Sequence, residues 1–266
     1  MARLRLTILG CGSSGGVPRI GGIWGACDPA NPKNRRSRCS LLVERITEDG
    51  TTRVLIDTSP DMREQLIREE VSVLDAVLYT HPHSDHVNGL DDLRQIVFLT
   101  RKRVPVWADG MTQHDLMARF AYVFVQPEGS SYPPICDLHT IKGPVTITGE
   151  GGPISFDPFE VDHGDIPALG FRIGKAAYLP DVLKIPEPVW ESHLTGLDCW
   201  IVDALRRTPH PTHAHLALAL EWIDRARPKR GVLTNMHIDL DHQTVEDETP
   251  AHISAAYDGM VLEFED

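Results

Sequence analysis

Three histidines and one aspartate lie within the six residues that follow Thr80, in the segment Thr80-His81-Pro82-His83-Ser84-Asp85-His86. This cluster comes directly after the apolar run 76–80, which we expect to be a buried strand. Imidazole is the commonest metal ligand in proteins, and a mixture of imidazole and carboxylate suits divalent ions such as Zn or Mn. A loop this short can direct His81 and His83 at one ion and Asp85 and His86 at another. The cluster therefore predicts a site for two divalent metals.

Three further residues with metal-ligand chemistry also follow apolar runs that we expect to be strands. His163 comes after residues 154–161, Asp181 after residues 176–180, and His237 after residues 231–234. Sites in α/β sheets are built outside the carboxyl ends of strands, so we expect these side chains to complete the first cluster. Two ions about 3.5–4 Å apart favour an anionic group between them. In this prediction one metal is bound by His81, His83 and His163. The other metal is bound by Asp85, His86 and His237, and Asp181 bridges the two metals.

Strand-like and helix-like segments alternate in both halves of the chain, which predicts an α/β protein. Ser59 and Thr212 are the expected N-caps of two helices, so His213 is expected at the positive end of a helix dipole. The Pro- and Gly-rich segment 126–160 is expected to join two halves of one fold. The expected strands are 4–9, 54–56, 76–80, 104–107, 154–161, 170–173, 176–179, 199–202, 231–234 and 260–264, and the expected helices are 59–70, 90–99, 112–125 and 214–227.

These motifs together resemble those of a known superfamily. The chain resembles the metallo-β-lactamase-fold hydrolases through THPHSDH and the spaced His163, Asp181 and His237. Within them it is similar to the branch that contains phosphoribosyl cyclic phosphate phosphodiesterase and the tRNA 3′-processing endonuclease RNase Z. The similarity to the phosphodiesterase rests on LGCGSSGGVP, NPKNRRSRCS, LIDTSPDMR, PHPTHAHL, LTNMHIDLDH and AYDGM. It implies a single domain over residues 1–266, folded as a four-layer αββα sandwich with the dinuclear site along one edge.

The resemblance also implies roles for residues outside the main motif. The family places an aspartate at Asp57 to support the histidine loop, and a catalytic histidine at His213. Asp203 is expected to act as Asp57 does or to contact the substrate. The last metal-ligand histidine of this branch commonly follows Leu-Thr directly, where this chain has Asn235. His237 lies two residues further on, and residues two apart on a strand share a face, so His237 is the expected ligand and Asn235 the alternative.

A separate structural zinc is not expected. Some cyclic phosphodiesterases bind one through a cysteine cluster in the loop that corresponds to residues 19–38. Here only Cys27 is present in that loop, and Ile238 replaces a later histidine of the site. A four-coordinate structural zinc needs more ligands than these.

The loop from Gly10 to Gly16 is rich in Gly and Ser but lacks the Gly-Lys-Ser/Thr ending of a P-loop. Beside a dinuclear site, its backbone N–H groups and the hydroxyl of Ser13 or Ser14 are expected to hold a phosphate oxygen.

The predicted reaction is the hydrolysis of a phosphodiester, with His213 and Asp85 as the expected catalytic residues. A hydroxide that bridges two metals would attack phosphorus, and His213 would stabilise the phosphoryl oxygens or protonate the leaving oxygen. The resemblance implies a small substrate such as a cyclic nucleotide or a ribose cyclic phosphate. The alternatives are a tRNA 3′-processing endonuclease, a thioester or lactone hydrolase, and a nucleotide-binding module without catalysis.

Composition restricts the partners. The 266 residues include 38 acidic and 26 basic side chains, for a net charge of −12, which argues against long nucleic acid and anionic membranes. No apolar run approaches the roughly 18 residues of a membrane span. Five scattered cysteines and the absence of a signal-peptide pattern at the start favour a cytoplasmic protein with reduced thiols. The expected partner is a small phosphodiester or nucleotide, and a homodimer stays open.

Overall fold

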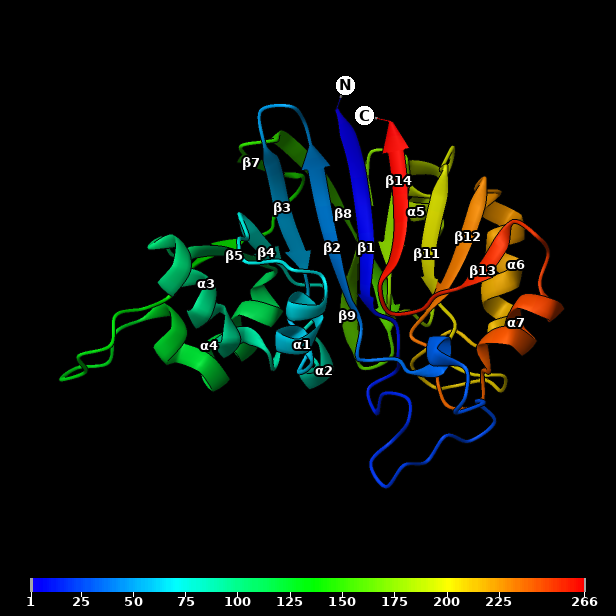
Figure 1. Cartoon of the computed structure of the whole chain (residues 1–266). Helices are drawn as coiled ribbons and strands as arrows, with labels where there is room; N and C mark the ends of the chain where they lie inside the picture. Colours follow the sequence, from blue (N-terminus) through cyan, green and yellow to red (C-terminus); the bar gives the residue numbers. More distant parts are fainter. Residues whose placement is uncertain (1, 266) are drawn as a thin grey trace. The chain divides into compact units, whose positions relative to one another are not determined.

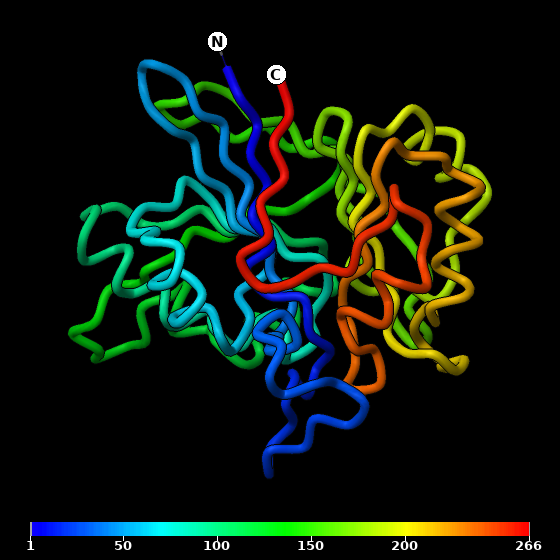
Figure 2. Tube along the Cα trace, turned by 45° about the vertical axis from the view of Figure 1, so that its right-hand side comes forward, coloured from blue at the N-terminus to red at the C-terminus, as the bar shows by residue number. Residues whose placement is uncertain are grey.

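The computed structural model describes residues 2–265 and divides them into two compact units. Unit 1 is made from residues 2–9, 40–155 and 261–265, and unit 2 from residues 10–39 and 156–260. Figure 1 labels most elements of both units, and Figure 2 traces the chain through them. The expectation of one domain over residues 1–266 stays a prediction.

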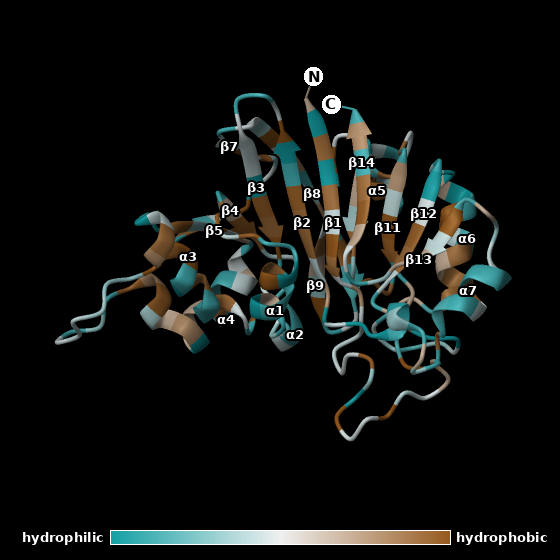
Figure 3. Cartoon of the chain, viewed as in Figure 1, coloured by the Kyte–Doolittle hydropathy of each residue, from teal (hydrophilic) through white to brown (hydrophobic). Residues whose placement is uncertain are grey.

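Unit 1 contains a seven-stranded sheet in the order β14-β1-β2-β3-β4-β5-β6. Strands β3, β4, β5 and β6 run parallel, so their carboxyl ends lie at one edge of the sheet, while β2 is antiparallel to β3. The carboxyl-terminal part of β3 is brown in Figure 3, because Val54, Leu55 and Ile56 are apolar. The strands of this sheet are β1 (Arg3–Gly10), β2 (Ser40–Ile46), β3 (Thr51–Ile56), β4 (Ala76–Leu78), β5 (Val104–Ala108), β6 (Cys136–Thr140) and β14 (Met260–Glu265). Strand β7 (Val145–Gly149) also lies in unit 1 but belongs to the second sheet.

Helices pack on this sheet through a continuous apolar core. Met62, Leu66, Leu93 and Ile96 from the helices join buried strand residues such as Val77 in one cluster. Burying a side chain of this size contributes roughly 1.5–3 kcal/mol, so this packing fixes the loops that begin where the strands end. The helical elements of unit 1 are α1 (Met62–Arg68), α2 (Ser84–Val87), the 3₁₀ turn η2 (Leu90–Asp92), α3 (Leu93–Thr100) and α4 (Gly110–Phe124).

The second sheet has the order β13-β12-β11-β10-β9-β8-β7, and the boundary between the two units falls within β8. Strands β10, β11, β12 and β13 run parallel, whereas β8, β9 and β10 are joined by antiparallel pairing. The elements that lie wholly or mainly in unit 2 are η1 (Pro32–Asn34), β8 (Gly152–His163), β9 (Ile166–Ile173), β10 (Ala176–Leu179), α5 (Glu187–His193), β11 (Cys199–Asp203), α6 (Leu216–Ala226), β12 (Arg230–Thr234), α7 (His242–Glu248) and β13 (Ile253–Ala255).

Unit 2 has its own core. Trp200 of β11 is fully buried and meets Trp190 of α5 edge to face, with ring centroids 6.0 Å apart. Helix α6 approaches β12 closely at Gly231, where a Cβ atom would lie 2.8 Å from Cδ1 of Ile223. Any larger residue here would have to displace the end of the Ile223 side chain, so the glycine lets the helix pack closely on the parallel strands whose ends carry candidate site residues.

The predicted α/β class is confirmed by two mixed sheets with helices. Strand β10 has the predicted bounds, and β1, β5, β8, β11, β12 and β14 differ from theirs by one or two residues. The predicted strand 170–173 is the second half of β9, and the predicted strand 76–80 ends at Leu78 as β4. The crossover segment 126–160 contains β6 and β7, which the sequence did not predict, and most of β8, which it did.

Two predicted N-caps are wrong. Ser59 does not cap α1, which begins at Met62 with Asp61 as its N-cap; instead, the Ser59 hydroxyl accepts a hydrogen bond from the Asp61 N–H in the preceding turn. Thr212 does not cap α6, which begins at Leu216 after His215. Ala214 donates its N–H to the Val182 carbonyl, at 2.6 Å, and this contact keeps the chain out of the helix until Leu216. His213 therefore does not lie in the first turn of α6.

Other boundaries differ as well. The predicted helix 90–99 opens as the 3₁₀ turn η2 before α3 begins, the predicted helix 112–125 is α4 (Gly110–Phe124), and the predicted strand 54–56 begins at Thr51 as β3. Within residues 2–265, no helix is both long and apolar enough to cross a bilayer.

Candidate active site

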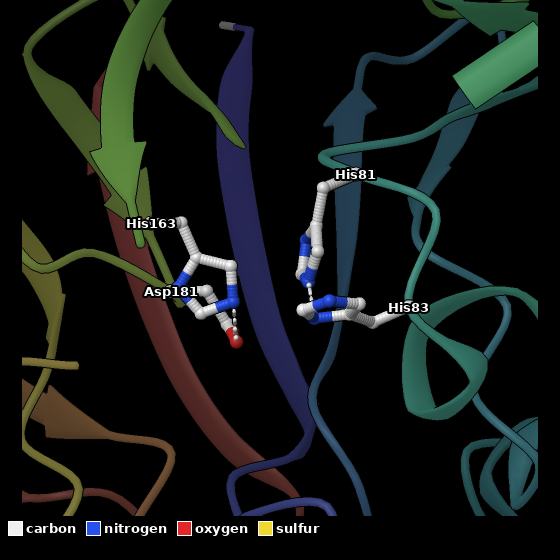
Figure 4. Close-up of side chains that lie close together, drawn as sticks. All are labelled: His81, His83, His163 and Asp181. Atoms are coloured by element: carbon white, nitrogen blue, oxygen red, sulfur yellow. Dashed lines mark hydrogen bonds and ion pairs between the residues drawn. The ribbon is translucent and has the colours of Figure 1, made fainter. Parts of the chain in front are cut away.

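The metal-ligand motif of unit 1 forms the loop between β4 and the short helix α2. His81 is fully buried, and its Nδ1 lies 2.9 Å from the Thr80 hydroxyl. This contact directs the other ring nitrogen, Nε2, toward Nδ1 of His83 at 3.0 Å (Figure 4). His83 ends the extended stretch and is the N-cap position of α2. The two imidazoles thus present neighbouring nitrogen atoms from one loop.

Asp57 supports this loop from the end of β3. Its carboxylate accepts hydrogen bonds from the N–H and the hydroxyl of Thr80, both at 2.8 Å, and lies 2.8 Å from Nδ1 of His86. Burial raises the pKa of the Asp57 carboxyl, and the contacts with His86 and Thr80 act against that rise. Asp57 also has a φ of 65°, a left-handed conformation that non-glycine residues adopt mainly where the surrounding structure holds them. These contacts are those expected of a residue that orients the histidine loop.

His86 and Asp85 each point a possible metal-ligand atom at the other. Because Nδ1 of His86 faces the Asp57 carboxylate, a neutral imidazole presents its Nε2 lone pair on the opposite side. That Nε2 lies 3.6 Å from Oδ2 of Asp85. A lone pair facing a carboxylate is unfavourable unless a cation or a proton lies between them.

Unit 2 contains a second pair of this kind, His163 at the end of β8 and Asp181 after β10. Nδ1 of His163 lies 2.8 Å from the Thr212 carbonyl oxygen, which can only accept, so this nitrogen carries the hydrogen. Nε2 of His163 then faces Oδ2 of Asp181 at 3.5 Å (Figure 4). Both side chains are buried.

These donor sets fit divalent metal ions. His81, His83, His163 and Asp181 each offer one ligand atom. Within the units, paired donor atoms are 3.0 Å apart for His81 and His83, 3.5 Å for His163 and Asp181, and 3.6 Å for Asp85 and His86. Two ligands of one tetrahedral ion, each bonded at about 2.0–2.2 Å, have a similar separation. The donors are imidazole and carboxylate, which bind Zn and Mn.

A buried acid–base pair lies beside Asp181 in unit 2. Oδ2 of Asp203 is 2.9 Å from Nδ1 of His213 and accepts a hydrogen bond from the Val182 N–H at 3.1 Å. Burial raises the pKa of the Asp203 carboxyl to about 6, although the contact with His213 acts in the opposite direction. His213 is partly exposed, and its Nδ1 lies 3.7 Å from Oδ2 of Asp181. Because Nδ1 of His213 faces Asp203, Nε2 lies on the other side of the ring.

Asn235 belongs to the same network. It is buried, follows β12 with a φ of 59°, and its amide nitrogen lies 3.3 Å from Oδ1 of Asp203 and 3.2 Å from Nδ1 of His213. These contacts place the Asn235 amide against the acid–base pair.

His237 has partners on both sides of its ring. Nδ1 lies 3.0 Å from Oδ1 of Asp239, and Nε2 accepts a hydrogen bond from the guanidinium of Arg19. Burial, followed by the positive charge of Arg19, lowers the pKa of His237, which favours the neutral ring. Whether His237 or Asn235 supplies the last ligand stays a prediction. A metal at His237 would have to take Nε2 from Arg19.

Sequence reasoning missed Arg19. No local pattern marks this residue, because it lies 218 positions before the histidine that it contacts. Of the two serines expected to meet phosphate, Ser13 is buried and Ser14 is exposed.

Comparison with known proteins is consistent with this chemistry. Residues 52–238 match the family described as "Beta-lactamase superfamily domain". A solved structure described as a new diphosphatase from the PhnP family is 38% identical, with a TM-score of 0.86, and the alignment covers 99% of this chain and 98% of that one. Human tRNase Z, short form, shares the fold at 17% identity, with a TM-score of 0.65, over 97% of this chain and 98% of that chain.

One curated relative is much longer than this chain. An octanoyltransferase of Porphyromonas gingivalis is 34% identical over 97% of this chain but only 51% of its own length. The chain thus spans about half the length of that relative.

Proposed function

Because this chain belongs to the β-lactamase superfamily, we propose that it is a metal-dependent phosphodiesterase that acts on small nucleotide or ribose phosphodiesters. The superfamily fold implies the use of divalent metals, and His81, His83, His163 and Asp181 offer suitable ligand atoms. Support for hydrolysis at phosphorus comes from the similarity to a PhnP-family diphosphatase over nearly the whole of both chains. In this proposal the protein uses two Zn or Mn ions, which its imidazole and carboxylate side chains would hold.

The observation that carries the proposal is the buried Asp203 carboxylate 2.9 Å from Nδ1 of His213, beside Asp181. When bound, two divalent ions would activate water and neutralise charge on the phosphoryl oxygens. Asp203 holds the His213 ring in one orientation, so that Nε2 is the nitrogen directed at the substrate. A proton on that nitrogen can be donated to the leaving oxygen, a role that typically contributes 10²–10⁴ in rate.

The other residues of the proposed site hold or orient ligands. Asp57 keeps His86 in the tautomer whose Nε2 can bind metal, and the Thr212 carbonyl does the same for His163. Asn235 donates to Asp203 and thereby fixes the acid–base pair. The net charge of −12 supports a small substrate, since a long nucleic acid needs an extended basic surface.

A second candidate is thioester hydrolysis. It is favoured by the identity of 34% to half of a protein named octanoyltransferase, because that name denotes acyl transfer. Hydrolysis of a thioester would use the same ligands and the same acid–base pair, so the metal motif does not separate it from the first candidate.

The experiment that tests both is a substrate panel with protein reconstituted with Mn or Zn. The panel contains bis-p-nitrophenyl phosphate, 2′,3′-cyclic nucleotides, a tRNA precursor and an acyl thioester. We expect turnover of the diester and the cyclic nucleotides. Turnover of the thioester alone would replace the proposal with the second candidate. Cleavage of the tRNA precursor alone would make the protein an RNA-processing enzyme, and no turnover at all would leave a binding module.

A further inference from the structure

Arg19 lies over a tight turn in unit 2 that is built from Ser13 to Gly16. The turn closes with a hydrogen bond of 2.7 Å from the Gly16 N–H to the Ser13 carbonyl. A Cβ atom on Gly15 would lie 3.2 Å from Nε of Arg19, so the glycine allows the guanidinium to rest against the turn. The far end of the same guanidinium donates to Nε2 of His237. Arg19 therefore connects the glycine-rich turn with the end of β12.

The guanidinium of Arg19 pairs with no carboxylate of residues 2–265. Within residues 2–265 its side chain makes one hydrogen bond, to the neutral ring of His237, and no ion pair. Its Nε is buried and has no hydrogen-bond partner in the same part of the chain. This is unusual in a protein with 38 acidic side chains, since a half-buried guanidinium presents five donors and is stabilised by a carboxylate or phosphate.

Ser13 supplies a second buried donor on the same turn. Its side chain is 3% exposed, and its hydroxyl has no hydrogen-bond partner within residues 2–265. The Ser13 N–H donates to the Met236 carbonyl at 3.3 Å, which ties the turn to the residue that precedes His237. The Ser13 hydroxyl thus belongs to the turn against which the Arg19 guanidinium rests, and the turn and the guanidinium contact neighbouring residues, Met236 and His237. A buried hydroxyl without a partner is costly, and a ligand oxygen would remove that cost.

We propose that Arg19 and Ser13 form a phosphoryl-binding subsite beside His237, a step that rests on the proposed function. The ligand is the oxyanion of a phosphate ester, whose paired oxygens match the planar fork of a guanidinium. On binding, Arg19 exchanges its hydrogen bond to His237 for hydrogen bonds to the phosphoryl oxygens, and the Ser13 hydroxyl donates to the same group. The exchange frees Nε2 of His237. Arg19 is in this way a specificity-determining residue that selects phosphate esters over uncharged esters.

The test measures the binding of inorganic phosphate to the metal-reconstituted full chain by isothermal titration calorimetry. Arg19→Gln removes the charge with little change in size, and we expect phosphate to bind about 10- to 100-fold more weakly. Arg19→Lys keeps the charge but loses the fork, so an intermediate loss is expected. Ser13→Ala removes a neutral donor and is expected to weaken binding about 2- to 10-fold. Arg225→Gln is the control, because Arg225 pairs with Glu187 elsewhere in unit 2.

Two further measurements make the result decisive. Metal content is determined for every variant by mass spectrometry, and thermal unfolding shows that each is folded. If Arg19→Gln does not fold, the phosphate affinities of Arg19→Lys and Ser13→Ala decide whether the subsite exists. Phosphate affinities equal to that of the wild-type protein in the folded variants would overturn the subsite. A loss of affinity that follows a loss of metal would also overturn it, and would make Arg19 a residue that only positions His237.

Kinetics separate this inference from the proposed function. With bis-p-nitrophenyl phosphate, Arg19→Gln is expected to raise KM more than it lowers kcat, because Arg19 binds the phosphoryl group of the ground state. Diester turnover with an unchanged KM in the variant would refute the subsite and leave the proposed function intact. The opposite result is also informative. If the wild-type protein turns over no diester but binds phosphate more tightly than Arg19→Gln does, the subsite is retained and the proposed function is refuted.

Discussion

Oδ2 of Asp57 lies 2.8 Å from Nδ1 of His86, a residue 29 positions later in the chain, and both side chains are fully buried. Asp57 also fixes Thr80, the residue that contacts His81, so one carboxylate orients both ends of the histidine loop.

Replacing Asp57 with Asn therefore tests how far metal binding depends on this orientation. Asn tolerates the left-handed backbone at this position, so the variant is expected to fold. Its amide can no longer act as a charged acceptor for the His86 ring, and a metal affinity about 10- to 100-fold lower is expected. Competition with a chelating dye measures the affinity. An unchanged metal affinity would mean that the histidine loop keeps its orientation without the Asp57 carboxylate.

Removal of Asp181 tests the ligand set in unit 2. Asp181→Ala is expected to lose metal content and diester hydrolysis together, because the carboxylate that faces Nε2 of His163 disappears. Metal is counted per chain by mass spectrometry after reconstitution and dialysis. As a control, Asp198→Ala removes a carboxylate of the same unit that pairs with Lys229 at 2.8 Å. Full metal content in Asp181→Ala would show that Asp181 is not a ligand.

His213 should affect catalysis without affecting metal content. His213→Gln is expected to lower kcat by about 10²- to 10⁴-fold, because the proton donor to the leaving oxygen is lost. Asp203→Asn should lower kcat as well, since Asp203 orients the ring. Rates with bis-p-nitrophenyl phosphate provide the measurement, and His215→Gln is the matched control. If His213→Gln also loses metal, His213 is a ligand rather than an acid.

A pair of variants decides between the two alternatives for the last metal ligand. His237→Ala is expected to lose about one metal per chain, while Asn235→Ala should retain the metals and lose rate through Asp203. Metal stoichiometry and kcat are measured side by side. The reverse result, with metal lost only in Asn235→Ala, would make Asn235 the ligand and leave His237 as a partner of Arg19 alone.

Asp241 gives a prediction for acid stability that is independent of the metals. Burial acts to raise the pKa of this N-cap carboxyl of α7, but hydrogen bonds from Thr244, Asp28 and Asn34 outweigh it and lower the pKa to about 2. Because the folded pKa lies below the ordinary value of 3.8, the carboxylate stabilises the fold above about pH 4. This stabilisation is lost as the pH falls from about 4 through 2.

Asp241→Ala is expected to lower the free energy of unfolding by about 1 kcal/mol at pH 7, as the loss of an N-cap usually does. The difference between the variant and the wild-type protein should shrink as the pH falls from 4 to 2. Urea unfolding at a series of pH values measures it. A difference that stays constant over this range would show that the charge of Asp241 contributes nothing.

The candidate ligands near His81 could be predicted from the sequence because they are local. Four ligand-type side chains within six residues, directly after an apolar strand, need no knowledge of distant contacts. The same holds for the alternation of strands and helices, since hydrophobic periodicity is a property of short segments. The resemblance to the metallo-β-lactamase-fold hydrolases is likewise confirmed by the family match, and the chain is similar to a PhnP-family diphosphatase over nearly its whole length.

The predictions that depended on backbone geometry at helix starts were less successful. Thr212 has the right residue type for an N-cap, but the hydrogen bond between Ala214 and Val182 delays α6 until Leu216. A local preference worth about 1 kcal/mol yields to a backbone contact made across 32 positions of the chain.

By itself, then, the sequence determined the α/β class, the loop of candidate metal ligands and the superfamily, because each of these depends on residues that lie close together in the sequence. Only the tertiary structure decided that Arg19 donates to His237, that Asn235 and Asp203 hold His213, and that Ser13 is a buried donor. These contacts join residues from 10 to 218 positions apart. Folding brings such side chains together through the packing of whole strands, which no local pattern of residues records.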